Sequence, residues 1–151
     1  MKELFADVVE ILKGIAAIEW IDEDRGQLDI YQSPPVSFPC ALISLDIPTW
    51  KETKDPGEQV GTVNLTVSLG FDVRHPIGNA ATEILTKALN HLQTVEDVSF
   101  ALRGLSGSAN TYRHLCAMAI RRRITETGIK VYMLSFEGSC RMVPKIEEPA
   151  P

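Results

Sequence analysis

The residues best suited to chemistry in this sequence are a histidine and a cysteine two positions apart, His114 and Cys116. Residues with this spacing share a face of a β-strand, and an imidazole beside a thiol can activate it as a nucleophile. The residues around them, Leu115 and Ala117, are apolar, which favours packing over catalysis. The sequence therefore holds one candidate Cys/His pair, with a structural role as the favoured interpretation.

Three consecutive carboxylates, Asp22, Glu23 and Asp24, could bind a divalent cation through their oxygen atoms. They are followed by Arg25 and Gly26, a combination typical of a solvated turn. The ligand spacing of a calcium-binding loop is absent from the sequence. We therefore expect a polar turn here and no metal site.

Other chemical signatures are absent from the sequence. It contains no GxxxxGK[ST], GxGxxG or HExxH motif, and its other two histidines, His75 and His91, lie far from each other along the chain. The odd set Cys40, Cys116 and Cys140 is typical of free thiols in a reducing cytoplasm, with one disulfide and one free thiol as the alternative. These observations predict a protein that is not an enzyme and has no cofactor.

Composition predicts one folded domain. The chain has 151 residues, 44% of them hydrophobic and 23% charged, which is enough to build a core without disulfides or metals. Its net charge of −5 argues against a dedicated nucleic-acid binder, but permits a surface past which DNA moves. Acidic residues interrupt the apolar pattern of the first 17 residues, and no apolar run reaches membrane-spanning length. We expect neither a signal peptide nor a membrane contact.

The elements that must position these residues begin with an amphipathic helix over 2–17. Short strands are predicted over 18–22 and 28–31, followed by a strand over 39–47. A charged connector over 51–61 contains the turn sequence Asp-Pro-Gly. It leads into a strand over 62–73 whose apolar residues alternate without error. The last two strands form a long antiparallel hairpin.

The second half of the sequence predicts two helices and another hairpin. A helix over 80–92 has an apolar side, made of Ile84, Leu85, Ala88, Leu89 and Leu92. A separate short helix over 95–103 would begin after Thr94 as its N-cap. Strands over 112–126 and 129–142 flank a Thr-Gly turn. The predicted fold is α+β, a mostly antiparallel sheet of two long hairpins with helices packed on one face. Residues 1–142 form a single domain, and 143–151 a disordered tail.

Two surface features remain as candidate protein interfaces. Arg121, Arg122 and Arg123 lie within a predicted strand, so that alternation sends Arg122 to one face and the other two to the opposite face. Because unpaired charge is costly to bury, this segment is solvated, salt-bridged or at a subunit contact.

The other feature is Trp50, at the start of the charged connector beside Lys51, Lys54 and Asp55. Tryptophan beside a polar loop is a frequent interface anchor, although Trp50 could equally cap the core.

The order of these elements resembles the tail-terminator or tail-completion (minor tail) proteins of long-tailed phages and prophages. The resemblance covers about 1–142. It lies in the opening helix, the prolines before the strand at 41–47, the charged loop ending at Gly61, the Gly-Phe-Asp-Val strand end at 70–73, the helix at 80–92 and the final hairpin. The stretch over 95–110 is longer than the family pattern.

The resemblance implies a virion structural protein. Members of that family form a homohexameric ring on the finished tail tube, stop its polymerisation and present a surface to the head connector, with DNA passing through the lumen. It also implies assembly in the host cytoplasm and a final location in the virion tail. The long hairpin and the Arg121–123 strand become candidates for the two subunit faces of such a ring. The alternatives are a small-molecule-binding α+β module or accessory subunit and, third, an enzyme.

Overall fold

The computed structural model describes residues 1–74, 81–108 and 111–143. Its elements follow in the order α1 (Lys2–Lys13), β1 (Trp20–Glu23), α2 (Gln27–Ile30), β2 (Cys40–Glu52), β3 (Gln59–Asp72), α3 (Ala81–Leu102), β4 (Tyr112–Ile124) and β5 (Ile129–Met142). The five strands form one sheet in the order β1-β2-β3-β5-β4. The predicted α+β class is confirmed.

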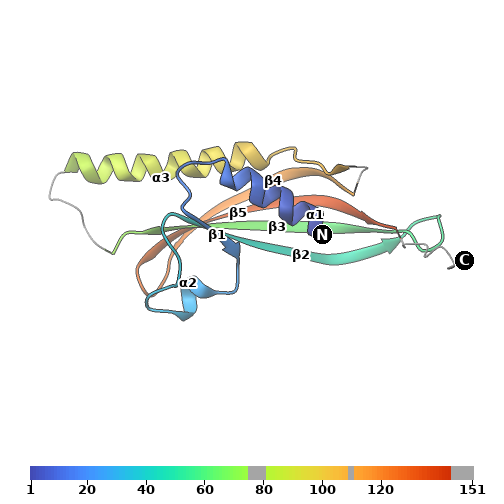
Figure 1. Ribbon diagram of the computed structural model, residues 1–151, viewed down its shortest axis with the longest axis horizontal. Coiled ribbons are helices and arrows are strands. Elements are labelled where there is room, and N and C mark those ends of the chain that lie inside the picture. Colours follow the sequence, from blue (N-terminus) through green and yellow to red (C-terminus); the bar gives the residue numbers. More distant parts are fainter. Residues whose placement is uncertain (75–80, 109–110, 144–151) are drawn as a thin grey trace, which may run out of the picture.

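The sheet is built from the two predicted hairpins, β2–β3 and β4–β5, joined by antiparallel pairing of β3 with β5 along their whole length. Only β1 runs parallel to its neighbour, β2. The helices α1 and α3 lie on one side of the sheet, and α2 lies on the other (Figure 1). The prediction of helices on one face therefore holds for α1 and α3 but not for α2.

The main core lies between the sheet and the two longer helices. The alternation predicted for β3 places Val63, Leu65, Val67, Leu69 and Phe71 on this face, all at most 1% exposed. From α1, side chains at every fourth position, Leu4, Val8 and Leu12, pack against them. Burying each such side chain stabilises the fold by about 1.5–3 kcal/mol. We refer to this as the helix-covered face.

The opposite face carries a smaller core, made of Leu28, Cys40, Leu42, Ile129 and Val131. Leu28 belongs to α2, so the predicted strand over 28–31 is wrong. Gly26 adopts a φ of 77°, and its carbonyl accepts hydrogen bonds from the amides of Asp29 and Ile30, which turns the chain into one helical turn. That turn directs Leu28 onto the sheet.

A single helix, α3, replaces the two that the sequence predicts. The Thr94 hydroxyl donates a hydrogen bond to the carbonyl of Asn90, 3.0 Å away, instead of capping a new helix. Val95, Val98 and Leu102 are buried on the sheet, each at most 3% exposed. Thr94 itself is only 5% exposed, and His91, one turn earlier, stacks on Phe71 of β3, so packing on the sheet extends across Thr94 and favours an unbroken helix over the local capping signal.

The charged connector is shorter than predicted. β2 runs to Glu52 and β3 begins at Gln59, which leaves only 53–58 as the loop. Gly57 has a φ of 79°, as its turn sequence predicts. The loop is closed by the Thr53 amide, which donates to the Glu58 carbonyl. The strands pair almost to the tip because backbone hydrogen bonds between them do not depend on side-chain polarity.

The predicted helix over 2–17 ends earlier, at Lys13. Of the predicted tail over 143–151, all but Val143 lies outside the described residues. Among the described residues, none of the helices combines the length and apolarity needed to cross a bilayer.

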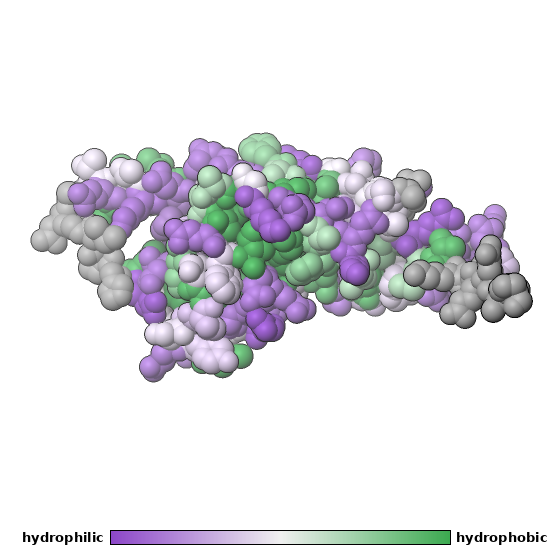
Figure 2. All heavy atoms as spheres, viewed as in Figure 1, coloured by the Kyte–Doolittle hydropathy of each residue, from purple (hydrophilic) through white to green (hydrophobic). Residues whose placement is uncertain are grey.

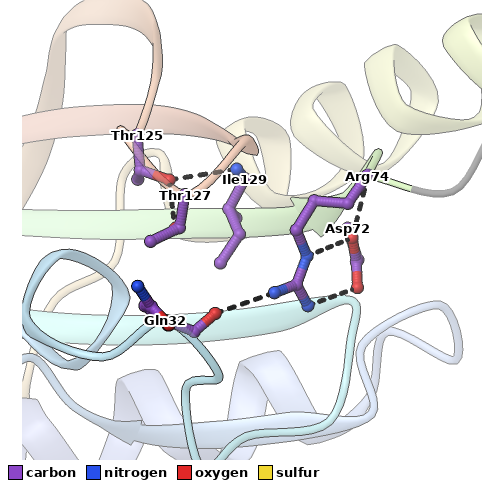
Figure 3. A network of polar contacts seen from close by, with 6 residues as sticks. All are labelled: Gln32, Asp72, Arg74, Thr125, Thr127 and Ile129. Carbon is purple, nitrogen blue, oxygen red and sulfur yellow. Dashed lines mark hydrogen bonds and ion pairs between the residues drawn. The ribbon is translucent and has the colours of Figure 1, made fainter.

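An arginine ties three segments together at the end of β3. Arg74 forms an ion pair with Asp72 and donates a hydrogen bond to the carbonyl of Gln32, in the loop after α2 (Figure 3). Its stem lies beside Gly128 in the β4–β5 turn, where a β-carbon would come within 3.1 Å of the arginine Cγ. In the same turn the Thr125 hydroxyl accepts a hydrogen bond from the amide of Ile129. The loop after α2 is thereby held against the turn.

Two acidic side chains fasten α1 to the start of β4. The Asp7 carboxylate accepts a hydrogen bond from the Tyr112 hydroxyl, 2.5 Å away, and burial raises the pKa of that hydroxyl. The Glu3 carboxylate accepts hydrogen bonds from the amide and hydroxyl of Ser108 and from the hydroxyl of Thr111. These bonds, first of all that from the Ser108 hydroxyl, lower the pKa of Glu3 below its ordinary value of 4.5.

Replacing Glu3 with glutamine should therefore destabilise the protein in a pH-dependent way. A lowered folded-state pKa stabilises the fold above the unfolded-state pKa, and this contribution is lost as the pH falls through the folded value. We expect the variant to melt below the unchanged protein at pH 7, and the two melting temperatures to converge towards pH 3. Glu10→Gln is the control, because Glu10 has only an exposed ion pair with Lys13. A gap that stays constant across this pH range would contradict the account.

Candidate interaction surfaces

The candidate Cys/His pair is not assembled. The ring of His114 lies 3.3 Å from the carbonyl of Gly104, at the end of α3, while the Cys116 thiol donates to the backbone carbonyl of His114. An irregularity in the β4–β5 register between Arg113 and Cys116 removes the strict alternation on which the pairing depended. Both side chains are exposed, so the predicted packing role of this segment falls to Leu115, which is 1% exposed.

The acidic segment is only partly the predicted turn: Asp22 and Glu23 are the last residues of β1, and the turn covers Asp24 to Gly26. Asp22 pairs with Arg25 at 2.7 Å, and Asp24 accepts a hydrogen bond from the amide of Gly26. Within 1–74, 81–108 and 111–143, no group of three or more His, Cys, Asp or Glu side chains is placed to hold a metal. The three cysteines are free thiols, Cys40 and Cys140 buried and Cys116 exposed. Burial raises the pKa of the Cys40 thiol to about 11.

Trp50 packs on the sheet at the hairpin end. It stands opposite Gly61, where an added β-carbon would come within 2.9 Å of the tryptophan ring and 2.8 Å of Ile47. The glycine leaves the space that the ring fills, and 37% of Trp50 remains exposed. Its use as an interface anchor stays a prediction.

The tip beyond Trp50 is polar and open to solvent. Lys51, Lys54 and Asp55 are all exposed. Below the tip, Glu58 forms an ion pair with Arg141 on β5, which lowers the pKa of the glutamate and raises that of the arginine. The hairpin end therefore exposes both positive and negative side chains, and the ion pair between Glu58 and Arg141 holds it to β5.

The three consecutive arginines differ in their surroundings. Arg123 donates two hydrogen bonds to the carboxylate of Asp29 on α2, at 2.6 and 2.8 Å, and this bond raises its pKa. Arg121 and Arg122 are exposed and have no ion-pair partner among the described residues. Arg122 stands opposite Tyr132 on the helix-covered face, and Arg121 opposite Met133 on the other face. The predicted alternation is confirmed, and two of the three guanidinium groups remain available.

An exposed apolar stripe on α3 is the surface that the sequence did not predict. Leu85, Leu89, Leu92 and Phe100 are 59%, 56%, 45% and 68% exposed. They lie to one side of the stripe that packs on the sheet, which contains Val95, Val98 and Leu102. The helix therefore has more apolar surface than the sheet covers. A helix that packs only on the sheet needs only one apolar stripe. The second apolar stripe in the sequence of α3 is therefore the signal that could have revealed this surface.

The edge strand β4 also exposes apolar side chains. Met118, Ile120 and Ile124 are 60%, 51% and 62% exposed. Figure 2 shows that hydrophobic residues also reach the surface in the middle of the face drawn, among polar ones. Exposed apolar residues gathered on neighbouring elements mark protein–protein contact sites in soluble proteins.

A cavity of about 500 Å³ lies between the first half of α3 and the end of β3. The ring of His91 forms its floor, stacked on Phe71 with the ring centroids 4.2 Å apart. Burial, together with nearby Lys130 and Lys87, lowers the pKa of His91. Its Nδ1 atom is buried, with no hydrogen-bond partner among the described residues. The cavity has the position that a small-molecule site would need.

Comparisons with known proteins identify a shared fold. No family model matches the sequence, and no curated protein matches it. Among solved structures, the chain is similar to one from the virion of a native gene transfer agent particle, with a TM-score of 0.56 and 16% sequence identity. The superposition covers 93% of this chain and 96% of the other. The two chains therefore have the same overall fold over nearly their whole lengths.

Proposed function

We propose that this protein is a structural component of a phage-type virion, and that it terminates the tail as a homo-oligomeric ring between the tail tube and the head connector. The observation that carries the proposal is the match with a virion chain, which extends over nearly the full length of both proteins. The element order that resembles tail terminators supports the same assignment independently.

The distribution of the surface residues supports an assembly role. The side chains that could do chemistry, His114 and Cys116, make separate contacts, whereas apolar side chains are exposed along α3 and β4. A ring requires two different faces on each subunit to meet. This chain exposes apolar side chains and unpaired charged groups on several sides. Such a surface fits a subunit with two contact faces better than it fits a monomer, which would leave the apolar groups in water.

The net charge of −5 suits a ring through which DNA passes. An acidic lumen repels phosphate, so that DNA can slide without being held. The exposed hairpin tip with Lys51, Lys54 and Asp55 lies at one end of the elongated molecule and is available for the tube protein or the head connector (Figure 1). In this proposal the protein is made in the host cytoplasm and ends in the virion tail.

Light scattering tests the ring directly. The purified protein would be measured at micromolar to millimolar concentration, alone and with a tail-tube protein of the same phage or prophage. We expect a closed oligomer of defined mass, at least in the presence of the tube protein. A monomer under both conditions would overturn the ring.

The cavity beneath α3 favours a second candidate, a small-molecule-binding module. Its volume of about 500 Å³ is within the usual range for ligand sites, and the buried Nδ1 of His91 could accept or donate one hydrogen bond to a ligand. A ligand that binds only the folded state raises the melting temperature. Stabilisation by a member of a metabolite panel, lost in Ala88→Phe, which fills the cavity, would favour this function over assembly.

A further inference from the structure

The two edges of the sheet carry opposite charge. β4 contains four arginines and no carboxylate, whereas residues 19–25, which include β1, contain four carboxylates and one arginine. β1 and β4 lie at opposite ends of the strand order, on the two outer edges. One molecule therefore presents a basic edge on one side and an acidic edge on the other.

The strand directions allow these edges to pair. β1 is parallel to β2, and each of the next three pairings along the sheet is antiparallel. β4 therefore runs opposite to β1. A second copy placed beside β4 in the same orientation offers its β1 as an antiparallel neighbour, which is the pairing that sheets form most readily.

The charges also match face by face. Glu23 stands opposite Ile43 and Arg122 opposite Tyr132, so both lie on the helix-covered face. Asp22 and Arg121 lie on the other face. On each face, the basic edge thus offers a guanidinium group and the acidic edge a carboxylate, of which that of Asp22 also pairs with Arg25.

Other parts of the edges are unsuited to pairing. The part of β2 beyond β1 contains Pro48, which has no amide hydrogen, and an irregular register between Asp46 and Thr49. The first half of β4 has irregular register near Cys116 and again near Ala119. The parts of the two edges that are suited to strand pairing are therefore the regular stretch of β4 over 120–124 and the four residues of β1.

Apolar side chains flank both remaining stretches. Ile120 and Ile124 are more than half exposed on β4, and Trp20, Ile30 and Tyr31 are 39%, 70% and 51% exposed around β1. Trp20 lies on the same face as Asp22, so that Arg121 of a neighbour can also approach its ring. Charge selects the partner edge, and the apolar residues exclude water around it.

We infer that β4 of one copy pairs with β1 of the next copy, with Arg122 facing Glu23 and Arg121 facing Asp22, and that this contact continues the sheet from subunit to subunit. The inference rests on the proposed ring and specifies which two faces meet. It differs from the expectation that the long hairpin supplies one of them, because Pro48 and the irregular register make its free edge unsuited to strand pairing. The contact is heterologous, so copies add head to tail until the ring closes.

Cysteine cross-linking tests this contact in a Cys116→Ser background. One variant carries both Glu23→Cys and Arg122→Cys, and the experiment includes the tail-tube protein. A bis-maleimide that spans the roughly 7–8 Å between diagonal neighbours also tolerates a register shift of two residues. We expect a ladder of covalent oligomers from the double variant and only dimers from a mixture of the two single variants. A control pair of exposed residues away from both edges, Glu10→Cys on α1 with Lys54→Cys in the β2–β3 loop, should give no ladder.

Charge reversal provides the second readout. Glu23→Arg or Arg122→Glu alone should weaken assembly by about tenfold or more, and combining them should restore most of it. The inference is overturned if the double cysteine variant gives no more ladder than the control, or if either single variant cross-links to itself as efficiently. An oligomer seen by light scattering without this ladder refutes the edge contact alone. A monomer in both measurements refutes the proposed ring as well.

Discussion

Replacing Leu102 with alanine is expected to lower the free energy of unfolding by about 2–5 kcal/mol, the range found when a fully buried leucine is truncated. Leu102 is 0% exposed in the last turn of α3, where it packs into the main core between the helices and the sheet. Its loss leaves a cavity that the surrounding strands cannot fill. Urea denaturation monitored by circular dichroism gives the change in free energy.

The matched control is the same substitution on the same helix, Leu89→Ala. Leu89 is 56% exposed and belongs to the stripe that the sheet does not cover. We expect its truncation to change the free energy of unfolding by no more than about 0.5 kcal/mol, as at most surface sites. Equal losses in the two variants would mean that the exposed stripe is part of the core, and the assembly role assigned to the surface of α3 would then fail.

Proline at position 96 should cost about 3 kcal/mol or more, because α3 is one unbroken helix. The ring removes the amide that hydrogen-bonds to the carbonyl of Leu92 and clashes with the preceding turn. If a new helix began after Thr94, as the local sequence predicts, residue 96 would lie in its first turn, where proline is tolerated. The size of the loss therefore decides between the two arrangements.

The control for this substitution is Glu96→Ala. Glu96 is exposed, so removing its side chain leaves packing unchanged, and alanine keeps the helix intact. We expect a change of less than about 0.5 kcal/mol. Should the proline variant be as stable as the alanine variant, the helix is interrupted near Thr94 and the buried stripe through Val95 needs another explanation.

The strands were the most predictable part of this fold. Val63 to Phe71 alternate without error, and that period of two determines both the strand and the face that enters the core. On β5, Tyr132, Leu134 and Phe136 likewise share the helix-covered face and are buried there. Both hairpins followed from the turn residues between such strands, with Gly57 and Gly128 at positive φ.

Helical segments were less predictable, because tertiary packing overrode local signals. Leu28 lies in a segment that reads as a short strand, yet the left-handed conformation of Gly26 turns it into α2. Thr94 has the sequence context of an N-cap, but its hydroxyl bonds back to Asn90 within a continuous helix. In both cases the burial of a side chain on the sheet, Leu28 or Thr94, decides against the local signal.

The candidate interface was only partly visible in the sequence. The run Arg121 to Arg123 indicated a surface of interest, but nothing local showed that Asp29, 94 positions away, pairs with Arg123 and leaves the other two available. Similarly, Leu85 and Leu89 carry the apolar pattern of a buried face. Their exposure depends on how far the sheet extends beneath α3, which is a property of the assembled fold.

In the proposed function this chain ends the growth of a tail tube, and tube length tests that role most directly. Tail-tube protein would be polymerised with increasing, substoichiometric amounts of this protein, and tube lengths measured by electron microscopy. We expect the mean length to fall as the protein is added, with labelled protein found only at tube ends and the effect lost in Arg122→Glu. Tubes of unchanged length without end-bound protein would contradict the account.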